Sequence, residues 1–410
     1  MSVRRDRLLL AAVICVVLLA QVLLYPGLGR LLDALGVGDG LDVRTWFLVT
    51  EFAAFVVFAG VWGLVSDVTG RRVQWIVLGA VGGATGYAVL ALSPLLGGFS
   101  FGTVLAIRVL QGAATIGAFS LAMTMLMDLE GGHGRNMGAA GIAIGLGAAV
   151  GAPIGGQLSV VDPVAPLLAA AGLLGGVAAL VWFVEDRAPE GSGRLLASLG
   201  SVRSTPVLVL PFAFGFVDRL TAGFFALVGT AYFEDAFGLG PAETGIMLAL
   251  FFAPFALLQY PMGVLSDRIG RVVPIVIGSI CYGAGVIAVG RAPTVGTAGA
   301  AMVLVGVLGA LVAPATMALV TDLAGDLDRG TSMAGFNLFG SLGFLAGFLV
   351  GGGVADDATL GIVDLPISGY SAAFHVVGGA EIAIAIVAVP VFVHVGRTRF
   401  PDGFVEHDRG

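Results

Sequence analysis

Long apolar segments recur along this chain, each about 20 residues long and separated by short polar or turn-forming stretches. A helix of that length crosses the roughly 30 Å of hydrocarbon in a lipid bilayer. Because a backbone in lipid must satisfy its own hydrogen bonds, segments of this kind favour helices. With 58% hydrophobic and 11% charged residues, the chain also has too little polar surface for a soluble domain of 410 residues. The sequence therefore predicts an all-α membrane protein embedded in a lipid bilayer.

The apolar runs between charged or turn-forming residues predict twelve transmembrane helices. They lie at residues 8–28, 45–66, 73–93, 100–127, 136–158, 164–184, 206–232, 242–265, 272–291, 295–321, 331–353 and 371–395. This pattern predicts an N-terminal six-helix bundle at 1–186, a central linker at 187–205, a C-terminal six-helix bundle at 206–398 and a tail at 399–410.

Arginines concentrate in alternate predicted loops, which indicates the orientation of the chain. If the N-terminus lies in the cytoplasm, the outer loops hold only Arg30, Arg44 and Arg291, and the other arginines outside the spans lie on the cytoplasmic side. The sequence thus predicts a multi-pass protein of the cell membrane with both termini and the central linker in the cytoplasm.

A short segment rich in glycine and charge occurs twice. Residues 63–72 read GLVSDVTGRR and residues 263–272 read GVLSDRIGRV, with glycine, serine, aspartate, glycine and arginine at the same spacing. Each copy ends the second predicted helix of its half and leads into the third. A duplicated turn in matching positions indicates an internal repeat of one six-helix unit.

These two copies resemble the loop signature of the major facilitator superfamily (MFS), and the resemblance extends over the whole chain. It implies the MFS fold, with twelve transmembrane helices in two pseudo-symmetric halves, and a transporter rather than an enzyme. Its partners would be a small-molecule substrate, bound between the halves near mid-membrane, and protons. We further expect a monomer without cofactor or metal ion, and the absence of a basic patch argues against nucleic acid.

The repeated loop is the predicted conformational gate. Gly63 would let predicted helices two and eleven pack closely, and Gly70 would permit a tight turn. By resemblance, Asp67 meets the start of helix eleven and locks the outward-facing state, and Asp128 meets Arg71 or Arg72. The complete predicted gate consists of Gly63, Asp67, Gly70, Arg71, Arg72, Asp128, Gly263, Asp267, Gly270 and Arg271, and Asp322 occupies the place of Asp128 in the second half. The alternative is that these charges only anchor the loops at the membrane surface.

Predicted helix four carries RVLQGAA at residues 108–114, which is similar to a second MFS motif, R-x-x-Q-G. An unpaired cation within the bilayer costs several kcal/mol, so Arg108 should face a wet cavity or a carboxylate. The spacing places Arg108, Gln111 and Thr115 on one helical face. The resemblance implies that Arg108 assists proton transfer; a purely structural ion pair with a neighbouring helix is the alternative.

Predicted helix five contains GLGAAVGAPIGG at residues 145–156. Its glycines recur at every fourth position, which predicts close contact with another helix, and its proline predicts a bend. The predicted packing motif consists of Gly147, Gly151, Pro153, Gly155 and Gly156. It resembles the motif G-P-x-x-G-G of the drug–proton antiporter branch, but Ala152 interrupts the Gly-Pro pair.

Charged residues within the predicted spans are candidates for proton coupling, because burying charge in lipid is costly. The candidates are Glu51, Arg108, Asp218 and Arg219. Adjacent residues on a helix point about 100° apart, so Asp218 and Arg219 are poor partners for each other. We therefore expect a pair across the cavity, either Asp218 with Arg108 or Arg219 with Glu51. The alternative for Glu51 is a carboxylate that reaches the interface. Glu381, midway along predicted helix twelve, is expected to be protonated or paired rather than functional.

Neutral polar groups on the cavity-lining helices are the candidate substrate contacts: Gln21, Tyr25, Gln111, Thr115, Gln259, Tyr260 and Asn337. The buried carboxylates and the aromatic residues favour proton-coupled efflux of a small, largely apolar or cationic compound by alternating access. A proton-linked importer or facilitator of a small metabolite, such as a sugar or organic anion, remains the alternative.

A membrane enzyme fits the sequence less well. GVGD at residues 36–39 has the form of an intramembrane aspartyl protease motif, but it lies in a predicted polar loop. No HExxH motif occurs, and the four histidines are scattered. A transport-inactive receptor of the same fold is the other alternative, against which the retained intramembrane charges argue.

Overall fold

The computed structural model describes residues 3–130, 133–186, 206–356 and 369–399, and in these ranges the regular structure is entirely helical. The first group of helices is α1 (Val3–Val22), the short α2 (Leu28–Ala34), α3 (Leu41–Thr69), α4 (Val73–Leu92), α5 (Phe101–Asp128), α6 (His133–Val161) and α7 (Ala165–Val181). The second group is α9 (Val209–Phe224), α10 (Thr230–Phe237), α11 (Pro241–Ile269), α12 (Val272–Gly290), α13 (Val295–Ala355) and α14 (Tyr370–Arg399). Short turns are η1 (Ser93–Leu96), η2 (Pro206–Leu208) and the π-helical η3 (Phe225–Gly229). The predicted linker at 187–205 and residues 400–410 of the predicted tail lie outside the described residues.

Ten helical segments of the described residues are long and apolar enough to cross a membrane. Two of them, Val295–Ala324 and Gly335–Ala355, are parts of the single helix α13. Both predicted spans, 295–321 and 331–353, are therefore present, but they are joined in one continuous helix, because the polar residues between them include no proline. The predicted span at 206–232 lies within one candidate span, Pro206–Phe237, in which a π-helical turn stands between α9 and α10.

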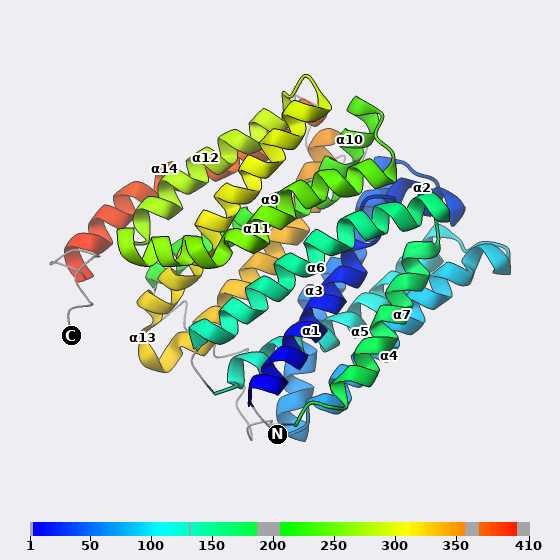
Figure 1. The fold of residues 1–410 in the computed structure, drawn as a ribbon, viewed down its shortest axis with the longest axis horizontal. Coiled ribbons are helices and arrows are strands. Elements are labelled where there is room, and N and C mark those ends of the chain that lie inside the picture. Colours follow the sequence, from blue (N-terminus) through cyan, green and yellow to red (C-terminus); the bar gives the residue numbers. More distant parts are fainter. Residues whose placement is uncertain (1–2, 131–132, 187–205, 357–368, 400–410) are drawn as a thin grey trace.

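The long helices lie side by side in one bundle, with α1–α7 on one side and most of α9–α14 on the other (Figure 1). The short helices α2 and α10 lie at one end of this bundle. The first turn of α1 and the last turn of α14 lie at the opposite end (Figure 1). Two helix pairs form the main seams between the two sides, α6 with α11 and α3 with α13.

Glycines bring α6 into backbone contact with two neighbours. A Cβ atom added at Gly155 would lie 2.1 Å from the carbonyl oxygen of Leu23, at the end of α1. One added at Gly156 would lie 2.3 Å from the carbonyl oxygen of Pro241 in α11. The close contact predicted for the glycine stripe is therefore present, and α6 runs continuously through Pro153.

The contacts described between α3 and α13 lie toward the α2–α10 end. The Phe52 ring stacks on Phe344 with centroids 4.6 Å apart, and a Cβ atom added at Gly352 would lie 2.5 Å from Thr45 Oγ1. At the same end, Arg44 Nη1 of α3 lies 2.7 Å from Glu234 Oε2 of α10. These contacts seal the α2–α10 end between the two sides.

Toward the opposite end, α3 exposes one apolar face. Its side chains there are 45–79% exposed: Val57, Val61, Leu64 and Val68. Gly63 has no described atom within 4 Å of an added Cβ, so the described residues show no close packing at Gly63. The predicted contact of Asp67 with the start of span 331–353 involves side chains outside the described residues. Among the described residues, the contacts given for α3 with α13 thus lie toward the α2–α10 end, and α3 is exposed toward the other end.

The contact between α1 and α6 predicts that an added methyl group destabilises the fold at Gly155 but not at Gly172. Gly155→Ala should destabilise the fold by about 1–3 kcal/mol, because the new Cβ meets backbone atoms that cannot turn away. Gly172→Ala in α7 is the control, since nothing lies within 4 Å of its added Cβ and alanine favours helix. Thermal unfolding of the two purified variants tests this; equal midpoints would contradict the packing described.

Candidate functional site

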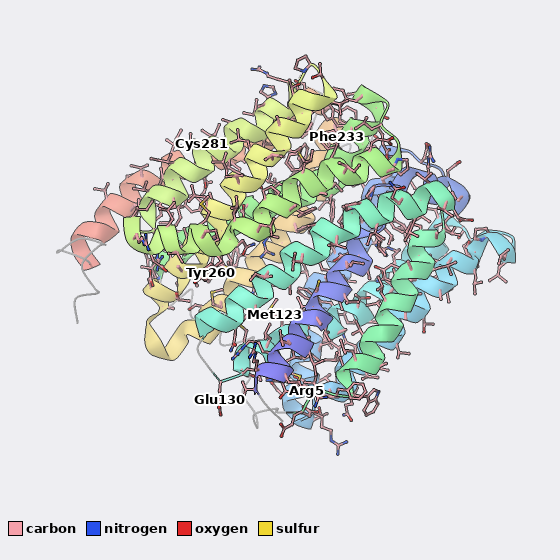
Figure 2. The ribbon with its side chains drawn as sticks, in the orientation of Figure 1. Arg5, Met123, Glu130, Phe233, Tyr260 and Cys281 are labelled. Carbon is pink, nitrogen blue, oxygen red and sulfur yellow. The ribbon has the colours of Figure 1, made fainter. Side chains whose placement is uncertain are left out.

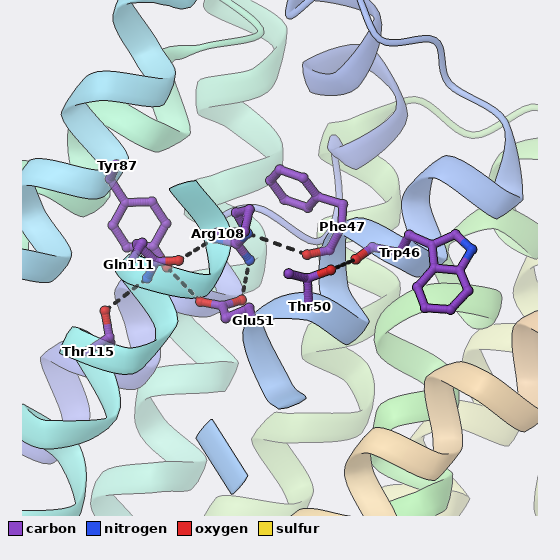
Figure 3. A network of polar contacts seen from close by, with 8 residues as sticks. All are labelled: Trp46, Phe47, Thr50, Glu51, Tyr87, Arg108, Gln111 and Thr115. Atoms are coloured by element: carbon purple, nitrogen blue, oxygen red, sulfur yellow. Dashed lines mark hydrogen bonds and ion pairs between the residues drawn. The ribbon is translucent and has the colours of Figure 1, made fainter. Parts of the chain in front are cut away.

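A network of buried polar side chains connects α3, α4 and α5 (Figure 3). Arg108 Nη2 of α5 forms an ion pair with Glu51 Oε2 of α3, and both residues are 0% exposed. Arg108 Nη1 donates to Gln111 Oε1 at 2.7 Å, and Gln111 Nε2 donates to Thr115 Oγ1 at 2.8 Å. The Tyr87 hydroxyl donates to Glu51 Oε1 at 3.3 Å. The network therefore runs for two turns along the face of α5 that the spacing predicted.

Aromatic and backbone groups complete the surroundings of the arginine. The guanidinium carbon of Arg108 lies 4.2 Å from the centroid of the Phe47 ring, and Arg108 Nε donates to the Phe47 carbonyl oxygen at 3.4 Å. A cation over a ring face in a desolvated site gains about 2 kcal/mol or more. The charge is thus satisfied by a carboxylate, an amide, a carbonyl and a ring, as a cation inside a membrane requires.

Glycines explain why these helices approach closely enough for the network. A Cβ atom added at Gly112, the glycine of the RVLQGAA motif, would lie 2.8 Å from the Glu51 carbonyl oxygen. From the α4 side, one added at Gly86 would lie 2.4 Å from Gln111 Cβ, and one added at Gly83 would lie 2.4 Å from Thr115 Oγ1. The motif thus supplies both the charge and the space for its partner.

The partner predicted for Arg108 was wrong. Both preferred pairs, Asp218 with Arg108 and Arg219 with Glu51, join the two halves, whereas the observed pair lies within the first half. The physical reason is that α3 and α5 pack directly against each other. Glu51 is also fully buried, so the alternative of a carboxylate at the interface does not hold in this conformation.

The second half holds another set of intramembrane charges. Asp218 and Arg219 are partly exposed on α9, and the Arg219 side chain lies against Gly340 of α13. Glu381 of α14 is 1% exposed, with its Oε1 2.9 Å from Thr221 Oγ1 of α9. The sequence placed Glu381 on a peripheral helix, but the side chain points into the bundle.

The first copy of the repeated loop forms a set of polar contacts. Gly70 ends α3 in the left-handed conformation (φ 62°), as its predicted turn requires. Arg72 Nη1 lies 2.7 Å from Asp128 Oδ2 at the end of α5, so Arg72 makes the predicted contact. The Nη1 of Arg71 instead lies 3.4 Å from Gln74 Oε1 of α4.

The second copy makes an analogous contact through Arg271, the second of its two arginines. Arg271 pairs with Asp267 in its own loop, and Arg271 Nε lies 3.1 Å from Asp322 Oδ2 of α13. Burial lowers the pKa of the Arg271 guanidinium, but hydrogen bonds and charges of the two aspartates outweigh it and raise that pKa overall. Gly270 joins α11 to α12 with φ 84°. Both copies therefore link the start of the third span of a half to the end of the fourth span, which for Asp322 is Val295–Ala324 within α13.

Asp186 is a loop residue that the sequence analysis missed. Its carboxylate accepts hydrogen bonds from the backbone N–H groups of Arg72 and Val73, at 3.0–3.2 Å, and so caps the N-terminus of α4 from the far end of the first half. Acidic groups favour helix N-termini because of the helix dipole. In the sequence, the only feature that pointed to Asp186 was its place among the acidic residues that follow the sixth predicted span.

The structure places the predicted substrate contacts in different environments. Tyr25 is buried within electrostatic range of Glu51 and Arg108. Gln21 is also buried, and its Nε2 has no hydrogen-bond partner among the described residues. Tyr260 of α11 is 76% exposed (Figure 2), whereas Gln259 and Asn337 are partly exposed.

Metal ligation finds no support in the described ranges, where no three His, Cys, Asp or Glu side chains are grouped to hold an ion. A bundle of long apolar helices with a buried charge network is the architecture of a polytopic membrane transporter. The chain belongs to the Major Facilitator Superfamily, whose family model matches residues 10–230 and 212–404.

Two relatives place the chain more narrowly. It is 30% identical over 282 residues to a class G tetracycline resistance protein of Vibrio anguillarum, covering 64% of this chain and 68% of the relative. This similarity supports the drug–proton antiporter-like branch. An uncharacterised MFS-type transporter of Methanocaldococcus jannaschii is 30% identical over 141 residues, which is 34% of this chain and 36% of that protein.

Solved structures share the fold at low sequence identity. The nucleoside transporter NupG superposes with a TM-score of 0.72 at 12% identity, over 96% of this chain and 99% of NupG. The human organic anion transporter MFSD10 gives 0.63 at 21%, over 94% and 99%. A bacterial homologue of the human lysosomal transporter Spinster gives 0.71 at 15%, over 98% of each chain.

The buried ion pair predicts strong non-additivity between two substitutions. Glu51→Gln or Arg108→Gln alone should destabilise the protein by about 3–5 kcal/mol, because each leaves an uncompensated buried charge. The double variant should cost less than the sum of the two, as thermal unfolding and a double-mutant cycle would show. Additive losses would contradict the pair, and Arg271→Gln with Asp322→Asn, at a more exposed site, is the matched control.

The cap on α4 predicts a smaller effect. Asp186→Ala should cost about 0.5–2 kcal/mol, since two N–H groups lose their acceptor. Asp186→Asn keeps an acceptor oxygen and should retain most of the stability. Thermal unfolding of both variants measures this difference. An equal loss of stability in both would show that the negative charge of Asp186, and not its acceptor oxygen, stabilises α4.

Proposed function

We propose that this protein is a secondary active transporter of the cell membrane that couples proton movement to efflux of a small, largely apolar or cationic compound. The observation that carries the proposal is the fully buried Glu51–Arg108 network within the first half. Charges at this depth are costly and persist where ions or substrates pass. The similarity to a tetracycline resistance protein supports efflux as the direction.

The proposed topology has twelve spans in two halves, residues 1–186 and 206–398. It adds α1 and α7 to the ten apolar segments; α1 begins with a charged turn, and α7 has 17 residues. The arginine distribution supports placing both termini in the cytoplasm. With that orientation, the end toward which α3 is exposed faces inward and the α2–α10 end is the outer end.

Two gates would then alternate in one monomer. The ion pair Arg44–Glu234 and the Phe52–Phe344 stack would close the outer gate in this conformation. Closure of the inner end would bury the exposed face of α3 against α13. The repeated loops, with Gly63, Asp67, Gly263 and their arginine–aspartate contacts, would set the geometry of that inner closure.

The substrate would bind between the halves. Tyr25 lies near the charge network in the first half, and Gln21, one turn earlier, has an Nε2 without a hydrogen-bond partner in the described part of the chain. Gln259, Tyr260 and Asn337 would contribute from the second half. An aromatic and amide surface of this kind suits an apolar or cationic molecule, through stacking and cation–π contacts.

Reconstitution into proteoliposomes that contain a pH-sensitive dye tests coupling. A panel of lipophilic cations, sugars and organic anions would be added to wild type and to Asp218→Asn. We expect a lipophilic cation to trigger proton movement in wild type, and Asp218→Asn to lose it because an intramembrane carboxylate is gone. Glu243→Gln, an exposed acid of α11, is the control and should behave as wild type.

Other outcomes separate the rival functions. Transport without any proton signal would overturn coupling and leave a facilitator whose buried charges are structural. Proton-linked uptake of a sugar or organic anion, with no response to lipophilic cations, would support the importer instead.

A further inference from the structure

We propose that Glu381 of α14 is a proton-binding site, occupied in this conformation, which exchanges its proton with Asp218 of α9. This inference rests on the proposed proton coupling and assigns the coupled proton to the second half of the chain. The observation behind it is an imbalance of buried charge between the two halves.

The buried acid of the first half, Glu51, has a positively charged partner. Glu51 is paired with Arg108, so one negative and one positive charge cancel, and Tyr87 donates a further hydrogen bond. A carboxylate paired in this way keeps its charge, because its partner compensates the loss of water. Glu51 therefore has a cationic partner in this conformation, whereas no described ion pair reaches Glu381.

The second half has two acids and one arginine at the corresponding depth. Glu381 and Asp218 lie within electrostatic range of each other, and Tyr282 of α12 lies within range of both. Among the described residues, the cation recorded near these acids is Arg219, which follows Asp218 in α9 and lies against Gly340 of α13. No described salt bridge reaches Glu381, so two ionised acids would leave one uncompensated negative charge. A proton on Glu381 makes the cluster neutral.

Hydrogen-bond counting at Thr221 supports the same assignment. Thr221 Oγ1 lies 2.9 Å from Glu381 Oε1 and 3.3 Å from the Val217 carbonyl oxygen. A threonine hydroxyl has a single hydrogen. With an ionised Glu381, Thr221 can donate its hydrogen to Glu381 or to Val217, but not fully to both. A protonated Glu381 can donate to Thr221, which leaves the Thr221 hydrogen for Val217.

The helix packing shields this carboxyl from lipid. A Cβ atom added at Gly283 of α12 would lie 2.3 Å from the Gly378 carbonyl oxygen and 2.9 Å from Glu381 Cβ. The two glycines thus bring α12 and α14 together over Glu381, which is 1% exposed. A carboxyl without water or a cation is most stable in its neutral form.

Asp218 provides the route to water. It precedes Thr221 by three residues, so both side chains lie on the same face of α9, toward α14. Asp218 is partly exposed, whereas Glu381 is buried. When the proton passes from Glu381 to Asp218, a carboxylate forms at the first and is neutralised at the second, and the net charge stays unchanged. Release from Asp218 to water leaves one negative charge, which a cationic substrate would compensate.

The other titratable groups near Glu381 do not replace it. Tyr282 faces the acids from α12, and Asp218 and Arg219 from α9. His375 lies on α14 itself, almost two turns away, where its Nδ1 contacts the Ser371 carbonyl oxygen at 2.6 Å. It sits closer to the α2–α10 end than Glu381 does.

Infrared spectroscopy of the purified full-length protein in nanodiscs tests the site directly. The carbonyl stretch of a protonated carboxylic acid is separate from that of a carboxylate. We expect this band at neutral pH in wild type, its loss in Glu381→Gln, and its retention in Glu51→Gln and Glu243→Gln. Thr221→Val should keep the band but shift its frequency, because the hydrogen bond is removed.

The outcomes distinguish this inference from the proposed function. An unchanged band in Glu381→Gln would overturn the proton site, even if transport is proton-coupled. A band that Glu381→Gln abolishes, in a protein that moves no protons, would support the site and overturn the coupling. If Glu381→Gln fails to fold, Glu381→Asp replaces it: a shifted band supports the site, and an identical band overturns it.

Discussion

The low dielectric of the membrane interior governs this structure, because every charge placed there must be compensated by the protein itself. The Glu51–Arg108 pair meets that requirement with a carboxylate, an amide, a backbone carbonyl and an aromatic ring. Such a set can form only where α3, α4 and α5 approach within backbone contact. The small residues of α4 and α5 are therefore as much part of the site as the charges, since any larger residue at Gly112 would separate the two ions.

The two seams of the bundle differ in what holds them. The α6–α11 seam is made of glycines against backbone, as at Gly156 and Pro241. The α3–α13 seam closes through side chains such as Phe52 and Phe344, and α3 is exposed beyond them. Backbone contacts tolerate little sliding, whereas side-chain contacts can separate and re-form. A motion that opens one end and closes the other is easier at α3–α13 than at α6–α11.

The sequence predicted the class, the repeated loops and the glycine stripe because each depends on local patterns. The length of each apolar run indicates a membrane span, and Gly70 indicates a turn. The spacing of Gly147, Gly151 and Gly155 indicates which face of their helix packs closely against a neighbour. It failed where the partner came from another helix: Arg108 joins Glu51 rather than Asp218, and Asp186 caps a helix more than a hundred residues earlier. Pattern within one helix specifies which side chains share a face, but not which neighbour that face meets. The continuous α13 was missed because charged residues outside the bilayer do not end a helix.

The same limit explains Glu381. A carboxylate on the last predicted span looked peripheral, because position along the chain was the only guide to its surroundings. Yet Gly283 on α12 and Gly378 on α14 let these two helices pack closely over the Glu381 side chain. The Glu381 carboxyl also lies within hydrogen-bonding distance of Thr221 in α9. Two glycines on separate spans thus convert a residue that would face lipid into one enclosed by protein. An intramembrane acid should therefore be judged by the small residues on the helices around it as well as by its own helix.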